Sequence, residues 1–414
     1  MEVSQASRDD EAGASVEGPV VDDGVRPADV IAMAFAIFLA GVLFAAYCRY
    51  LELSRPGVLT RSGFYGVSAH GQPDQFYYLR TARVLAGWHA PRGTGQYRYG
   101  LGYPILAVPF IWLGLHSDPF APVDALAFGG ALALTFVLGT RLSPFRSRTS
   151  TLAFGMAAAA VVGLSSPLVG VASVPWNSNI VVPLGLFVLV VATAKDKVTV
   201  SRTIAVGVAI GWIFAIRYLD AFFLGLPIVV MVVRSTPAQR RRVVIGGGTA
   251  LAVMVVLVLA SQQYAFGNFL TTPYHFHTRA AGTTNDQSIS EYRPSSIPKH
   301  FIGGFITGKD DHGVRQPRDP ILRDFPLLVF MPVGAYILWR RRFDTRAVWL
   351  SAIAGSALGS LFYLSFVAGG GGDLKFGNAH YWAPWYPLWS ILAIVGLTAI
   401  ATRIISANHR HAPL

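Results

Sequence analysis

The sequence predicts an all-α integral membrane protein of about ten transmembrane helices, with long outer loops that carry amphipathic helices. The chain has 414 residues, of which 53% are hydrophobic and only 14% are charged, and its mean hydropathy is +0.46. Its apolar residues are gathered in long runs, and about 20 such residues match the thickness of a bilayer. We therefore expect one polytopic domain over residues 27–404, embedded in a lipid bilayer.

The two ends of the chain are expected to be cytoplasmic tails. Residues 1–26 are rich in Glu, Asp, Ser and Gly and have no apolar periodicity, which is typical of a disordered segment. This acidic start, with no small-residue cleavage site after residues 28–48, argues against a removed signal peptide, so residues 28–48 form the first predicted transmembrane helix. Residues 405–414 form the second tail.

Nine further apolar runs complete the predicted set of ten spans. They cover residues 121–140, 152–168, 180–194, 203–216, 221–233, 243–265, 325–339, 347–367 and 384–402. Residues 101–115 are also apolar, but fifteen helical residues extend only about 22 Å, against about 30 Å for the bilayer core. We expect this segment to be a half-buried or re-entrant helix.

Basic residues fix the predicted orientation. The short loops on one side carry 16 Lys and Arg residues, whereas the opposite short loops carry Arg217 and Lys375. By the positive-inside rule the basic side and both termini are cytoplasmic, and the two long loops, residues 49–120 and 266–324, lie outside. The formal net charge of +12 follows from these basic loops, so we expect no nucleic-acid partner. The single cysteine, Cys48, excludes an intramolecular disulfide and is expected to be a buried thiol.

The first outer loop contains the chain's most polar helical pattern. Pro73 and Asp74 are typical of a helix start, with Asp74 at the N-cap. A helix from there places apolar and aromatic residues such as Tyr77, Tyr78 and Trp88 on one face, with Arg80 and Arg83 opposite. The pattern predicts an amphipathic helix that lies on a surface.

A second unusual feature is the run over residues 203–233, which is too long for one ordinary span. A charge near the middle of a span is costly in lipid, so Arg217 marks a break between two shorter helices. The break places Arg217 and Asp220 at the outer surface. There Arg217 would bind a lipid phosphate through its planar fork, or would form a structural pair with Asp220.

Five segments stand out for their order along the chain. They are PDQFYYLRTARVLAGW (73–88), GLGYPILAVPF (100–110), IGWIFAIRYLDAFFLGLP (210–227), QYAFGNFLTTPYHF (263–276) and GGGGDLKFGNAHYWAPWYPLWSILA (369–393). In this order they resemble the GT-C superfamily of membrane glycosyltransferases, in particular the polyprenyl-phosphate-sugar-dependent group, which includes protein O-mannosyltransferases and aminoarabinose transferases. Two positions depart from that pattern: Gln75 stands where many relatives have Glu, and His380 stands where Arg before Tyr is common.

This resemblance implies inverting transfer of a sugar, a hexose or a pentose, on the outer face of the cytoplasmic membrane. The donor would be a polyprenyl-phosphate sugar, and the acceptor a cell-envelope glycan, lipid or protein. Such a reaction needs a base near the attacking oxygen and cations near the departing phosphate, so Asp74 is the candidate base. The candidate substrate-binding residues are Tyr77, Tyr78, Arg98, Tyr103, Arg217, Lys375, His380 and Tyr381.

Each candidate also has a structural interpretation. Asp74 could serve only as a helix cap, and Tyr77 and Tyr78 could be interfacial belt residues. Lys375, His380 and Tyr381 could be side chains that reach the membrane interface. If Asp74 is not the base, the alternatives on the outer side are Asp118, Asp124, Glu291 and Asp310.

Two further possibilities concern metal and function class. His275 and His277, with Asp310 to His312, could bind a divalent metal, but their spacing matches no recognised site, so we expect no cofactor. A transporter or lipid flippase is the rival class, and a scaffold that has lost its chemistry is a third. Coupled transporters usually carry ionisable residues near the bilayer midplane, and none of the ten predicted spans has one there.

Overall fold

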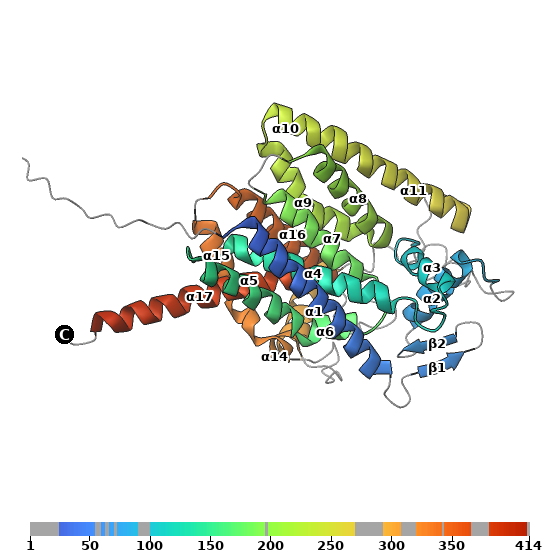
Figure 1. Cartoon of the computed structure of the whole chain (residues 1–414), viewed down its shortest axis with the longest axis horizontal. Helices are drawn as coiled ribbons and strands as arrows, with labels where there is room; N and C mark the ends of the chain where they lie inside the picture. The colour runs from blue at the N-terminus through green and yellow to red at the C-terminus, as the bar shows by residue number, and fades with distance from the viewer. Residues whose placement is uncertain are drawn as a thin grey trace, which may run out of the picture.

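The computed structural model describes residues 25–53, 59–62, 66–69, 73–89, 100–194, 198–269, 293–307, 320–341, 343–365 and 381–411. Over these residues the chain forms a bundle of helices (Figure 1), which confirms the all-α prediction. The described part also contains one short hairpin that the sequence did not predict. Its strands, β1 (Leu59–Ser62) and β2 (Gly66–Ala69), pair antiparallel within the predicted first outer loop.

The ten predicted spans lie mainly on helices, but the span 152–168 extends past the end of α5 into a separate short helix, α6 (Ser166–Ala172), and the span 347–367 ends outside the described residues. The 3-10 turn Pro326–Phe330 precedes α15, and the π-helical turn Val243–Gly247 joins α10 to α11. The helices are α1 (Pro27–Leu53), α4 (Ala121–Leu142), α5 (Arg148–Gly163), α7 (Ser178–Ala192), α8 (Val200–Ile216), α9 (Tyr218–Arg234), α10 (Pro237–Arg242) with α11 (Gly248–Phe266), α15 (Met331–Arg340), α16 (Arg346–Ser365) and α17 (Tyr386–His411).

Among the described residues, five helical segments are long and apolar enough to cross a membrane: α1, α4, α10 with α11, α16 and α17. The helices on the other five predicted spans have between 10 and 17 residues. The structure therefore supports a multi-pass membrane protein, whereas the count of ten crossings stays a prediction.

The described residues also form five shorter α-helices: α2 (Pro73–Leu85), α3 (Pro104–Trp112), α6 (Ser166–Ala172), α13 (Ile297–Phe301) and α14 (Ile321–Asp324). The 3-10 turn Pro294–Ser296 precedes α13, and the π-helical turn Ile302–Thr307 follows it. The nine residues of α3 extend only about 14 Å, so this helix is too short to cross a bilayer, as expected for the segment 101–115. In Figure 1 the hairpin, α2 and α3 gather at one end of the bundle, and the C-terminal part of α17 projects from the opposite end.

Helix α1 packs closely on α4 because glycines lie where the two helices meet. A Cβ atom added to Gly41 would lie 2.9 Å from Cα of Gly129, and one added to Gly129 would lie 2.6 Å from the carbonyl oxygen of Phe38. Small residues allow such close approach of membrane helices. The opposite side of α1 stays uncovered, since Ile31 and Leu43 are 69% and 71% exposed, which suits a helix that faces lipid.

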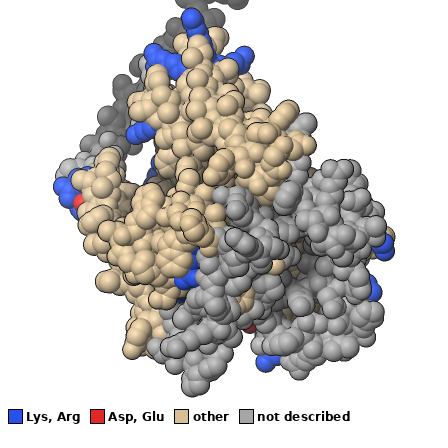
Figure 2. All heavy atoms as spheres, turned by 90° about the vertical axis from the view of Figure 1, so that its right-hand side faces the viewer, with Lys and Arg blue, Asp and Glu red and all other residues tan. Residues whose placement is uncertain are grey.

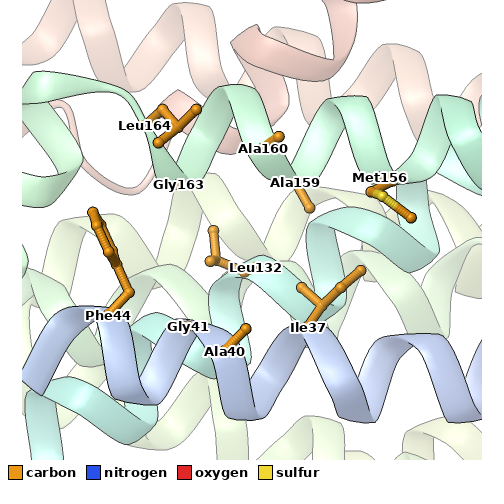
Figure 3. A pocket seen from close by; sticks show the side chains of 10 residues that line it. All are labelled: Ile37, Ala40, Gly41, Phe44, Leu132, Met156, Ala159, Ala160, Gly163 and Leu164. Carbon is orange, nitrogen blue, oxygen red and sulfur yellow. The ribbon is translucent and has the colours of Figure 1, made fainter.

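An apolar groove of about 280 Å³ runs between α1, α4 and α5 (Figure 3). Phe44, Leu132 and Met156 line it from these three helices, and every other lining residue is also apolar or glycine. A groove without a polar side chain offers no group for acid–base chemistry or phosphate binding. The candidate site is therefore sought among the polar clusters.

Arginines at the helix ends next to the predicted cytoplasmic loops contact residues of neighbouring helices. Arg148 at the start of α5 lies 2.6 Å from a carboxylate oxygen of Asp29 at the start of α1. Arg141 at the end of α4 donates to the Thr193 hydroxyl beyond α7, at 2.8 Å. These arginines therefore lie at one end of the bundle, as the charge bias predicts.

Candidate active site

Helix α2 places the predicted base, Asp74, in its first turn. The helix begins at Pro73, so Asp74 is its second residue and not the N-cap that the sequence predicted. Proline is favoured as the first helical residue, because a backbone N–H at that position has no hydrogen-bond partner within the helix and proline has no N–H. A carboxylate in the first turn still interacts favourably with the helix dipole. The Asp74 side chain itself lies outside the part that the structure describes.

The predicted polar face of α2 is wrong. Arg80 and Arg83 were expected to point into water, yet each is only 3% exposed. Arg83 Nη2 donates to the carbonyl oxygen of His116 at 2.6 Å, and its guanidinium lies 4.9 Å from the centre of the Trp88 ring. Burial lowers the pKa of Arg83. The helix does not lie on a surface but is enclosed on both its apolar and its arginine side.

Two of the predicted substrate-binding tyrosines belong to an aromatic cluster under α2. Tyr78 and Tyr103 are 3% and 1% exposed, and their rings meet edge to face with centres 5.2 Å apart. Tyr103 also stacks on Phe120, with ring centres 4.6 Å apart. Tyr77 is only partly buried and packs at the margin of this cluster. Of the three tyrosines, Tyr77 is therefore the one with a partly accessible side chain.

Beside this cluster lies a buried ionic network that joins α1 to α4. Arg49 donates from Nε and Nη2 to both carboxylate oxygens of Asp118, each at 2.7 Å. Its Nη1 lies 3.7 Å from Asp124, a carboxylate that is 1% exposed. The Tyr103 hydroxyl donates to Asp124 at 2.8 Å, and burial and the nearby carboxylate raise the pKa of Tyr103 well above its ordinary value. The network gives Asp118, Asp124 and Tyr103 structural partners.

The break that the sequence predicted at Arg217 is confirmed. Helix α8 ends at Ile216 and α9 begins at Tyr218, while Arg217 between them has extended backbone, with φ −147° and ψ 94°. The two helices are 17 residues each. The long apolar run is thus divided as its charge requires.

Arg217 is held by a second buried network. Its Nε lies 3.1 Å from Oδ2 of Asp220, and its Nη2 donates to the Tyr363 hydroxyl at 2.8 Å. That hydroxyl donates in turn to Oδ1 of Asp220 at 2.7 Å. The guanidinium also lies 5.1 Å and 5.6 Å from the ring centres of Tyr363 and Tyr381. The structural pair that the sequence offered as one interpretation is therefore present, and Tyr381 joins it.

The two networks lie on adjoining elements. Trp212 Nε1, in the last turns of α8, donates to the carbonyl oxygen of Gly102 at 3.1 Å. A Cβ atom added to Gly102 would lie 2.9 Å from Cβ of Ala215, so only glycine permits this approach. The segment that leads into Tyr103 therefore rests on the helix that ends at Arg217.

The remaining candidates lie outside the described residues. They are Arg98, Lys375 and His380, the alternative bases Glu291 and Asp310, and the proposed metal ligands His275, His277, Asp311 and His312. Within the part of the chain that the structure describes, no three His, Cys, Asp or Glu side chains are grouped to hold a metal ion.

Sequence reasoning missed Arg49 and Tyr363. Arg49 was treated as part of the long outer loop, yet α1 continues to Leu53, so this arginine lies within the helix and contacts Asp124 on α4. Tyr363 lies in an apolar run on α16, 143 residues from Asp220, and such a run gives no sign of a distant ionic partner. Arg49 directly follows the predicted span 28–48, so the signal that would have identified it is a charged residue at the very end of an apolar run, where the helix can continue.

Figure 2 shows the molecule from the end that carries α2, α3 and the hairpin. On this face the described surface is mostly neither acidic nor basic, and several of its blue atoms gather at the upper end. The ionic groups of both networks lie beneath the surface, since Asp220 is fully buried and Arg49 is 4% exposed.

Three solved structures share this arrangement of helices. ArnT from Cupriavidus metallidurans matches in its apo state with a TM-score of 0.51 and 16% identity, over 90% of this chain and 59% of that chain. The same protein bound to undecaprenyl phosphate matches with a TM-score of 0.52 and 15% identity, over 92% and 63%. The archaeal oligosaccharyltransferase AglB from Archaeoglobus fulgidus, in complex with an inhibitory peptide and a dolichol-phosphate, gives 0.53 and 11%, over 92% and 52%.

The fold is GT-C-like. At these identities the likeness concerns the fold, and the chain spans between 52% and 63% of the length of the three matched chains. No protein-family model matches the sequence. No curated protein matches it either.

Proposed function

We propose that this protein transfers a sugar from a polyprenyl-phosphate donor to a hydroxyl acceptor, at the end of the bundle that carries α2 and α3. The observation that carries the proposal is Arg217, a cation fixed at the break between α8 and α9. The fold supports it, because two of the matched structures hold undecaprenyl phosphate and a dolichol-phosphate. The acceptor would be a glycan, a lipid or a protein of the cell envelope.

The reaction requires a base for the acceptor hydroxyl and a cation near the departing phosphate. The acceptor oxygen forms a bond to the anomeric carbon as the bond from that carbon to the phosphate oxygen breaks, with inversion. The proton of the acceptor goes to the base, for which Asp74 is our candidate, and the polyprenyl phosphate leaves with the electron pair. No cofactor or metal is needed for this balance.

Arg217 suits the departing phosphate because its orientation is fixed before the donor arrives. Asp220 and the Tyr363 hydroxyl hold two of its nitrogens, and the ring of Tyr381 lies against the guanidinium. A cation whose position is set by such partners stabilises developing negative charge without reorganising. In this proposal Tyr77, Arg98, Lys375, His380 and Tyr381 border the donor, whereas Tyr78 and Tyr103 support α2 from below.

A transporter or flippase is the rival function. Coupled transporters place ionisable residues near the middle of their spans. Among the described residues of the helices on the predicted spans, the buried ionic groups lie near helix ends: Asp124 in the first turn of α4, Asp220 in the first turn of α9 and Arg49 four residues before the end of α1. This distribution favours the transferase.

The test is a reconstituted reaction. The purified protein in lipid nanodiscs would be incubated with synthetic polyprenyl-phosphate hexoses and pentoses and with an envelope extract, and products would be followed by mass spectrometry. We expect loss of one donor with transfer of its sugar, and the same acceptor should lack that sugar in a deletion strain. If no donor in the panel bound or turned over, while the protein moved a labelled lipid between leaflets, the flippase would replace the transferase.

A further inference from the structure

The opposite end of the helix pair α9 and α16 contains a second, cationic cavity. These helices run antiparallel: Tyr363 near the end of α16 contacts Asp220 at the start of α9. At their other end Arg234 and Arg346 line a cavity of about 310 Å³ together with Phe343, Ala347 and Leu350. This end also carries the arginines of α10, so it belongs to the basic side of the bundle.

The two arginines of this cavity lack partners among the described residues. Neither guanidinium of Arg234 or Arg346 has a hydrogen bond or an ion pair there, and the Nε atom of Arg346 is buried without an acceptor. Asp344 is the nearest carboxylate in the sequence, but it is exposed and pairs with neither arginine. A buried donor that lost its water without gaining an acceptor is costly, typically by about 1–3 kcal/mol.

The local electrostatics also favour an added anion. Two like charges that border one partly enclosed cavity repel each other. Arg346 is the first residue of α16, where the positive end of the helix dipole disfavours a cation. Arg234 is not needed to cap α9, because Arg240 already donates to the carbonyl oxygens of Val232 and Val233. An anion between the two arginines would relieve all these costs together.

We propose that this cavity binds the phosphate group of an anionic phospholipid. A guanidinium is suited to phosphate because its planar fork donates two parallel hydrogen bonds. A lipid is favoured over a soluble phosphate because Phe343, Ala347 and Leu350 make the rest of the lining apolar, and because the cavity lies at the ends of two apolar helices. Its volume is at the lower limit of small-molecule sites, about 300–1,000 Å³, which fits a headgroup.

The proposal is tested with the full-length protein in a neutral detergent. Phosphatidylglycerol, phosphatidylcholine or inorganic phosphate would be added, and both the melting temperature and the retained lipid in native mass spectrometry would be measured. We expect phosphatidylglycerol alone to raise the melting temperature by at least about 2 °C at saturation. An equal rise with inorganic phosphate would overturn the lipid assignment, and a rise of the same size with phosphatidylcholine would overturn the anionic one.

Two variants locate the effect. Replacing both arginines (R234Q with R346Q) removes the charges, whereas Ala347→Phe fills the cavity and leaves the charges in place. Each should abolish the shift and lower the retained lipid at least fivefold. The matched control is R241Q with R341Q, which removes the same charge from exposed arginines that do not line the cavity and should keep the full shift. If Ala347→Phe kept the full shift, the lipid would bind elsewhere, whether or not the double arginine variant folds.

Discussion

Tyr363 on α16 donates a 2.7 Å hydrogen bond to Asp220 on α9, although the two residues are 143 positions apart in the chain. The same hydroxyl accepts from Arg217, so one oxygen ties an arginine, a carboxylate and two helices together. Both Asp220 and Tyr363 are buried. Two predictions concern this network directly, through Tyr363 and Arg217.

Removing the hydroxyl tests whether it supports Arg217. Tyr363→Phe removes the hydroxyl that donates to Oδ1 of the buried Asp220, which should cost about 1–3 kcal/mol and lower the melting temperature. Transferase activity should fall as well, because Arg217 loses one of the partners that orient it. Tyr264→Phe, at a tyrosine that is 77% exposed, is the control and should change neither quantity. Full stability with full activity in Tyr363→Phe would mean that this hydrogen bond is dispensable.

Replacing Arg217 separates donor binding from structure. Arg217→Lys keeps the charge but cannot contact Asp220 and Tyr363 through a planar fork. Loss of a charge-assisted hydrogen bond of about 1.5–3 kcal/mol corresponds to a rise in the donor KM of roughly 10- to 100-fold. If Arg217→Lys left KM and turnover unchanged while Arg217→Ala lowered the melting temperature, Arg217 would be a structural partner of Asp220 only.

Asp74 is tested by two substitutions at one site. Asp74→Asn removes the carboxylate base, so turnover should fall by a factor on the order of 10² while donor binding survives. Because Asp74 is the second residue of α2, loss of its charge should cost only about 0.3–1 kcal/mol through the helix dipole. Melting temperature, lipid binding and turnover of Asp74→Asn and Asp74→Ala would be compared. If Asp74→Asn retained most activity, the base would be sought at Glu291 or Asp310, since Asp118 pairs with Arg49 and Asp124 is buried.

Arg49 should be essential for stability. Arg49→Met would leave Asp124 buried without its cation and Asp118 without both hydrogen bonds, and breaking such a buried pair typically costs about 3–5 kcal/mol. The fall would be measured as a lower melting temperature and a lower yield in detergent. Arg26→Met is the matched control, because Arg26 is exposed in its pair with Asp29, and it should have no measurable effect. Equal effects of the two substitutions would contradict a role for burial.

The orientation in the membrane is tested by accessibility labelling on a Cys48→Ser background. Single cysteines at positions 141, 240 and 341 should be labelled from the cytoplasm, and those at 95, 284 and 371 from outside. The basic residues at one end of the bundle motivate this expectation. Labelling of position 240 from outside would invert the assignment, and cytoplasmic labelling of position 95 would mean that residues 101–115 cross the membrane.

Composition and charge alone were enough to predict the membrane class, the approximate positions of the long apolar helices and the break at Arg217. Within the bilayer the backbone N–H and C=O groups of an apolar run must form hydrogen bonds with one another, which favours a helix. A charge inside such a run is so costly that it indicates a helix end from the sequence alone. The order of short segments also predicted a GT-C-like fold, which the matched structures support.

The tertiary structure alone decided which charged groups meet. Arg80 and Arg83 follow the rules for an exposed helix face, yet both are buried, and His116 and Trp88 contact the guanidinium of Arg83. Tyr363 and Asp220, like Arg49 and Asp118, are joined across gaps of 143 and 69 positions. Periodicity describes one helix at a time, whereas burial and ion pairing depend on how distant helices pack, so these contacts could not be read from the sequence.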